Sequence, residues 1–98
     1  MHVTSCTRDG SLLSLDLVLS GPEWEAAGHV LRSRRHREGD PIGVLLLRST
    51  SVDSASGAWG TGVLLWVEER ISTEAALAWV EDAIGDDLLT RELDSVLA

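Results

Sequence analysis

The fold is decided at residues 3–19, which read VTSCTRDGSLLSLDLVL. Asp9-Gly10 is a residue pair that tolerates the positive φ angles of a tight hairpin turn, so segments 3–7 and 12–19 are predicted to be antiparallel strands. Leucine occupies alternate positions of the second segment, with serine, aspartate and valine between the leucines. This alternation predicts a strand that turns one side to a core and leaves the other side mostly solvated.

A helix is predicted directly after the second strand, over residues 22–37. The segment SGPE at 20–23 combines a serine suited to the N-cap, a proline suited to the first turn, and a glutamate three residues after the serine. Apolar residues recur at helical spacing from Trp24 to Leu31. Glycine, aspartate and proline at 39–41 supply the stop signal.

Two further strands are predicted at residues 42–48 and 61–68, which are leucine- and valine-rich runs bounded by glycine, proline and serine. The residues between them, 49–60, are predicted to form a small-residue loop. Both runs lack alternation and are apolar on both sides at 44–47 and 63–67. A sheet with helices on one face should be polar on the other, so something must cover the second face. The alternatives are the last helix, a second copy of the chain, or a different partner.

Two helices are predicted in the last third of the chain. The first begins at Thr73 or at the serine before it and ends near Gly85. The second is short and begins at Asp86 or at the aspartate after it. The element order is therefore β-β-α-β-β-α-α, and the predicted fold class is α+β, with a four-stranded, mainly antiparallel sheet and helices packed on one face. The length of 98 residues predicts a single α+β domain, 1–98.

The chain is acidic, with sixteen aspartates and glutamates, eight arginines and a formal net charge of −8. Nine of the acids but only two of the arginines lie from Glu68 onward, so the carboxyl-terminal third holds most of the negative charge. This charge opposes broad binding to nucleic acid or anionic membranes and favours a basic partner. Lysine, asparagine, phenylalanine and tyrosine are absent. Because their codons are AT-rich, we infer a GC-rich bacterial genome.

The expected location is the cytoplasm, without membrane association. No apolar run approaches the ~20 residues that span a bilayer. The amino terminus, MHVTSC, lacks the basic and apolar segments of a secretion signal. Cys6 is the single cysteine, so the chain is predicted to form neither an internal disulfide nor a cysteine-based zinc cluster.

The densest charged feature is Arg32-Ser33-Arg34-Arg35-His36-Arg37, which on first sight suggests phosphate or nucleic-acid binding. In the predicted helix these arginines would spread around the axis and occupy its last turns, where cations complement the helix dipole. A solvated helix terminus is therefore favoured over a nucleic-acid site, and a patch that grips an acidic protein segment stays open. His29 and His36 would lie about 10 Å apart along that helix, too far to ligate one ion. No metal ion or cofactor is predicted.

The leading functional hypothesis is a non-catalytic protein-interaction module of the accessory, adaptor or immunity type. It is expected to bind another protein, with a basic partner favoured by charge, and to form a homo-oligomer. No GxSxG or HExxH motif is present. The candidate partner-binding residues are one tryptophan and four acids: Trp59, Glu81, Asp82, Asp86 and Asp87. Leu93 and Leu97, on one side of the predicted last helix, are the candidate oligomer-interface residues.

Several alternatives stay open. Trp59 is either an exposed binding anchor at the end of the loop or a side chain folded back as a lid on the sheet. A small dimeric enzyme or ligand-binding protein would hold a pocket between sheet and helices and use His29, Cys6 or Trp66. A nucleic-acid-binding regulator would act through Arg32–Arg37 and is opposed by the net charge.

Overall fold

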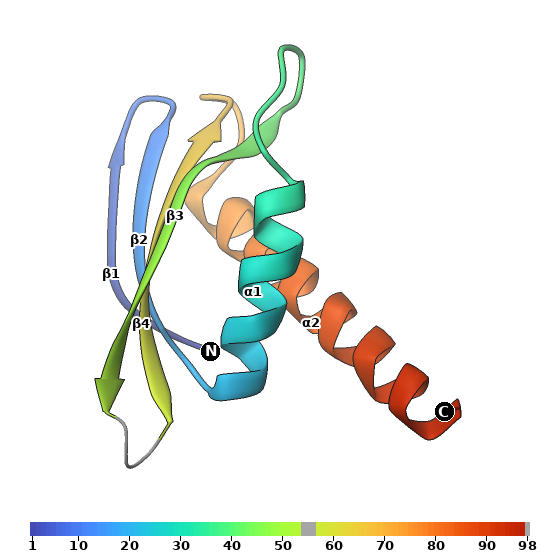
Figure 1. Cartoon of the computed structure of the whole chain (residues 1–98). Helices are drawn as coiled ribbons and strands as arrows, with labels where there is room; N and C mark the ends of the chain where they lie inside the picture. Colours follow the sequence, from blue (N-terminus) through green and yellow to red (C-terminus); the bar gives the residue numbers. More distant parts are fainter. Residues whose placement is uncertain (54–56, 98) are drawn as a thin grey trace.

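The computed structural model describes the backbone of residues 1–53 and 57–97 and the side chains of residues 1–50 and 57–89. These residues form four strands and two helices in the order β1 (His2–Asp9), β2 (Leu12–Leu19), α1 (Gly21–Ser33), β3 (Ile42–Asp53), β4 (Ala58–Val67) and α2 (Thr73–Leu97). The strands make one antiparallel sheet in the order β1-β2-β4-β3. Both helices lie on the same side of this sheet (Figure 1). The predicted α+β fold is confirmed.

The hairpin of β1 and β2 forms as predicted, with Gly10 at a φ of 59° in the turn. Every second residue of β2, from Leu13 to Leu19, is at most 1% exposed and belongs to the core under the helices. The residues between them are exposed or half-buried. Alternation along this strand therefore identified the buried side correctly.

The strand β4 alternates in the structure even though its sequence is apolar on both sides. Thr61, Val63, Leu65 and Val67 are buried, whereas the residues between them are half-buried on the opposite face. The predicted loop 49–60 is wrong, because β3 continues to Asp53 and β4 starts at Ala58. Backbone pairing joins Ser49 to Thr61 and Ser51 to Trp59. Strand hydrogen bonds use backbone groups, so small polar side chains do not prevent this extension of the hairpin.

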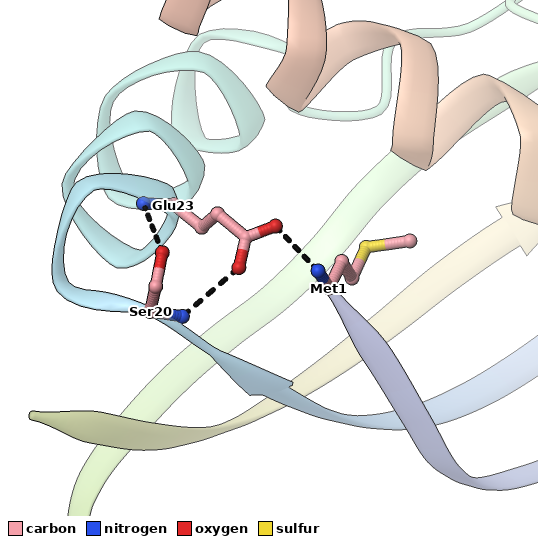
Figure 2. A network of polar contacts seen from close by, with 3 residues as sticks. All are labelled: Met1, Ser20 and Glu23. Carbon is pink, nitrogen blue, oxygen red and sulfur yellow. Dashed lines mark hydrogen bonds and ion pairs between the residues drawn. The ribbon is translucent and has the colours of Figure 1, made fainter. Parts of the chain in front are cut away.

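The helix α1 begins with the predicted capping box (Figure 2). The Ser20 hydroxyl accepts a bond from the Glu23 backbone N–H at 3.3 Å, and the Glu23 carboxylate accepts one from the Ser20 N–H at 3.0 Å. The same carboxylate pairs with the amino group of Met1. Partial burial raises the pKa of Glu23, but these hydrogen bonds outweigh it and hold the pKa below its ordinary value. The start of α1 is therefore tied to the amino group directly before β1.

The end of α1 differs from the prediction, because the helix stops at Ser33 and not near residue 37. The following segment pairs with the outer edge of β3 instead. The Val44 N–H donates to the Arg34 carbonyl at 2.9 Å, and the His36 N–H donates to the Val44 carbonyl at 3.0 Å. An edge strand presents unpaired backbone groups, and satisfying them competes with another helical turn.

The last third of the chain forms one helix, so the predicted division into two helices is wrong. Ala83, Ile84 and Leu88 pack on the core on both sides of Gly85, which keeps the same helix face in contact with it. A glycine inside a helix is about 1 kcal/mol less favourable than alanine, which packing of this kind overrides. Asp86 and Asp87 therefore lie within α2 and do not cap a new helix.

The arginine Arg8 joins β1 to the segment before α2. Its guanidinium donates to the Ile71 carbonyl at 2.6 Å, the Glu68 carbonyl at 3.1 Å and the Thr73 hydroxyl at 3.3 Å. Hydrogen bonds to a charged donor are stronger than neutral ones. They hold the start of α2 against the helix-covered side of the sheet.

The helix α2 does not cover the second face of the sheet, which excludes the first of the three alternatives above. Figure 1 shows its last turns running away from both the sheet and α1. In the part of the chain that the structure describes, no helix is long and apolar enough to cross a membrane. The sheet face opposite the helices, called the open face below, is therefore left bare by the described residues.

Candidate functional site

Apolar side chains gather on the open face where the three strands β2, β4 and β3 lie side by side. The register pairs Leu12 with Trp66, and Leu64 with Leu46. Directly paired residues of antiparallel strands point to the same face, so these four side chains form one group, called the apolar patch below. Leu12 is 45% exposed and Leu46 is 54% exposed, while Leu64 and Trp66 are half-buried. Two exposed leucines on β2 and β3 thus lie on either side of two half-buried apolar side chains on β4.

A glycine with one charge on each side lies next to the apolar patch. Gly62 on β4 is paired with Asp16 on β2 and with Arg48 on β3. A Cβ added at Gly62 would lie 3.5 Å from Arg48 Nε and 3.6 Å from Asp16 Oδ1. The two charged side chains therefore reach toward the missing side chain from opposite strands, and the sheet is hollow between them.

The segment after α1 closes one end of the apolar patch. The His36 ring packs against Trp66 in a tilted arrangement, with ring centroids 4.7 Å apart and an interplanar angle of 30°. It fits there because a Cβ at Gly43 would lie 2.4 Å from the His36 Cα. The His36 Nδ1 is buried and has no hydrogen-bond partner. The Trp66 ring and Gly43 thus hold this ring at the edge of β3.

The candidate anchor Trp59 lies on the helix-covered side of the sheet. Its ring stacks on Trp24 of α1, with centroids 4.0 Å apart and an interplanar angle of 12°. Trp59 is half-buried and is paired with Leu19 of the core. This position corresponds to the folded-back interpretation, in which the side chain packs on the sheet and does not project as an anchor.

The candidate acids on α2 differ from one another in their surroundings. Glu81, Asp82 and Asp86 are exposed. Asp87 is 13% exposed in its side chain, and its Oδ1 lies 3.1 Å from His29 Nδ1 of α1, so it joins the two helices. The backbone of Leu93 and Leu97 lies in the last turns of α2, but their side chains lie outside the described residues.

The residues of the alternative small-molecule pocket are not brought together. His29 contacts Asp87 on the helix side, Cys6 is exposed on β1, and Trp66 lies on the open face. Among the described residues, no group of three histidine, cysteine, aspartate or glutamate side chains is placed to hold a metal ion.

The arginines after α1 are arranged differently from the prediction. Because the helix ends at Ser33, they do not spread around a helix axis. Three of them, Arg34, Arg35 and Arg37, line one pocket together with Trp79 of α2. The glycine-aspartate-proline stop signal was readable in the sequence, but the pairing of this segment with β3 was not.

Comparison of the chain with protein-family models, with curated proteins and with solved structures found no match in any of the three. The candidate site is therefore defined by the geometry of the open face alone. Its defining features are the apolar patch and the two charges beside Gly62.

Proposed function

We propose that the chain is a non-catalytic protein-interaction module, of the accessory or adaptor type, whose docking surface is the open face. The observation that carries this proposal is the apolar patch, which lies on a sheet face that the described residues leave bare. Exposed apolar side chains in a contiguous patch mark surfaces that another protein buries. They are also compatible with the high charge of the rest of the chain, which keeps the free protein in solution.

The occupant that fits the open face is a second copy of the chain. Two sheets packed face to face about a two-fold axis along β4 bring Asp16 of one copy opposite Arg48 of the other, and the reverse contact follows by symmetry. Gly62 lies on β4, next to that axis, and it adds no side chain between the two charged residues. Leu64 and Trp66 also lie on β4, so each meets its counterpart. The face is thus complementary to itself in charge across the axis and in hydrophobicity along β4.

In such a dimer the exposed acids of α2 stay available, because both helices lie on the far side of the sheet. Glu81, Asp82 and Asp86 then form an acidic surface for a basic protein partner. We place this module in the cytoplasm, where a single exposed cysteine such as Cys6 stays reduced. Replacing Asp82 with arginine is expected to weaken capture of the dimer on an arginine-rich peptide without changing its solution mass.

The solution mass from light scattering at two protein concentrations tests the dimer. The wild-type chain is expected to be a dimer and Leu46→Arg a monomer with an unchanged circular dichroism spectrum, because a charge within the patch is desolvated on association. The matched control is Leu89→Arg, since Leu89 is 57% exposed but lies on α2. This control is expected to remain a dimer.

A charge exchange sharpens the test. Asp16→Arg and Arg48→Asp are each expected to weaken the dimer, because like charges then face each other, and the double exchange is expected to restore it. A wild-type chain that stays monomeric at the higher concentration would overturn the second copy as occupant. Dissociation by Leu89→Arg, with Leu46→Arg still dimeric, would place the interface on the Leu93 and Leu97 side of α2 and would also overturn it.

A further inference from the structure

A second concave site lies at the end of α1 and shares no residue with the apolar patch. It is a pocket of about 310 Å³ between the segment 34–42 and Trp79 of α2. Its lining holds three arginines but one acid, Asp40, in a chain that carries twice as many acids as arginines. Positive charge is therefore concentrated in a hollow of an otherwise acidic molecule.

The three arginines of this pocket have no acidic partner within the described residues. The ion pairs among the described residues involve Arg70, His29 and the amino terminus. None of them involves Arg34, Arg35 or Arg37. The Arg34 guanidinium lies over the Trp79 ring instead, 5.9 Å from its centroid. Guanidinium groups that line one pocket without ion pairs to a carboxylate repel one another, and an anion between them relieves that repulsion.

The backbone that carries the arginines is held in place at both ends. Arg34 and His36 are hydrogen-bonded to Val44 at the edge of β3. The turn that follows is closed twice, because the Asp40 N–H donates to the Arg37 carbonyl at 3.0 Å and the Asp40 carboxylate accepts from the Arg37 N–H at 3.2 Å. The Asp40 carboxylate is thus engaged by the backbone of its own turn. Because this backbone is already held in place, the site loses less conformational entropy when a ligand binds.

We propose that this pocket binds a small organic anion, in which a phosphate or carboxylate group lies between Arg35 and Arg37 and an apolar group contacts Trp79 and Ile42. Arginine matches both anions through paired N–H donors, and the aromatic ring supplies a surface for the apolar group. The volume lies at the small end of ligand pockets, which suits a ligand with one ring or one short chain. This site is independent of the dimer and stands whether or not the open face is occupied.

The probe is phenyl phosphate, followed by NMR through the indole N–H of Trp79 and compared with inorganic phosphate and with benzoate. Phenyl phosphate is expected to saturate this signal and to bind about tenfold more tightly than inorganic phosphate, because of its added apolar contact. The double variant Arg35→Gln, Arg37→Gln is expected to weaken binding by more than about tenfold. Arg32→Gln removes the same kind of charge from α1 outside the pocket lining and is expected to change binding less than about twofold.

Benzoate separates the two anion sources, since binding of benzoate as tight as that of phenyl phosphate assigns a carboxylate ligand and weaker binding assigns a phosphate ester. Two results would overturn the proposal. One is a Trp79 response that is unchanged in the double variant or never saturates. The other is a single-stranded oligonucleotide that binds far more tightly than phenyl phosphate with a steep salt dependence, which would assign the arginines to nucleic acid.

Discussion

Leucines lie on both faces of the sheet, but the helices cover only one of these faces. On β2, Leu13 and Leu15 are at most 1% exposed under the helices, whereas Leu12 on the same strand is 45% exposed on the open face. For these leucines the difference arises from what packs against each face, because the residue type is the same. The helix-covered face holds the fold together, whereas the open face leaves leucine side chains exposed.

The largest effect expected from this comparison is on the free energy of unfolding. Leu15→Ala, in the buried row of β2, is expected to lower it by about 2–5 kcal/mol through lost burial and a cavity. Leu12→Ala, on the open face of the same strand, is expected to lower it by less than about 1 kcal/mol. Both are measured by urea unfolding in the Leu46→Arg background, so that self-association does not contribute. Equal losses in the two variants would contradict the difference between the faces.

A smaller effect on the free energy of unfolding is expected at Gly43, where the segment after α1 packs against β3 at one end of the apolar patch. Gly43→Ala places a Cβ 2.4 Å from the His36 Cα, so that backbone must move, and a loss of about 1–3 kcal/mol is expected. Gly62→Ala is the matched control, because its nearest neighbours lie at 3.5 and 3.6 Å, and it is expected to stay within about 1 kcal/mol. The ring-current shift of His36 protons by Trp66 should be lost in the first variant and kept in the second.

The smallest expected effect on the free energy of unfolding concerns the capping box at the start of α1, which is one of the two helices on the buried face. Glu23→Gln is expected to lower the free energy of unfolding by about 1 kcal/mol at neutral pH. Because folding lowers the pKa of Glu23, this contribution is present above the pKa of the unfolded chain and is lost as the pH falls through the folded pKa. The difference between wild type and variant should therefore shrink below about pH 4.

The control for this cap is Glu74→Gln, which changes an exposed acid in the first turn of α2. It is expected to alter the free energy of unfolding by less than about 0.5 kcal/mol. A difference between Glu23→Gln and wild type that persists unchanged in acid would show that the lowered pKa does not stabilise the fold.

The candidate site was predictable in part. The apolar runs of β3 and β4 predicted a sheet face in need of cover, and the structure places Leu46, Leu64 and Trp66 there. The position of Trp59 was not decided by its neighbours in sequence, since its stack on Trp24 joins residues from a strand and a helix. The arginine pocket was missed, because a helix continued to residue 37 would have separated side chains that the shorter helix brings together.

Local chemistry in the sequence determined the elements. Asp9-Gly10 specified a hairpin, alternating leucines specified the buried side of β2, and the capping box at Ser20 specified the start of α1. Each of these depends on residues within a few positions of one another, so the sequence alone was sufficient.

Tertiary structure decided where the elements end and what they leave exposed. The edge of β3 ended α1 at Ser33, the core carried α2 through Gly85, and the placement of both helices on one side left the second sheet face open. These outcomes depend on competition between distant groups for backbone hydrogen bonds and apolar surface. That competition is settled only when the chain is folded.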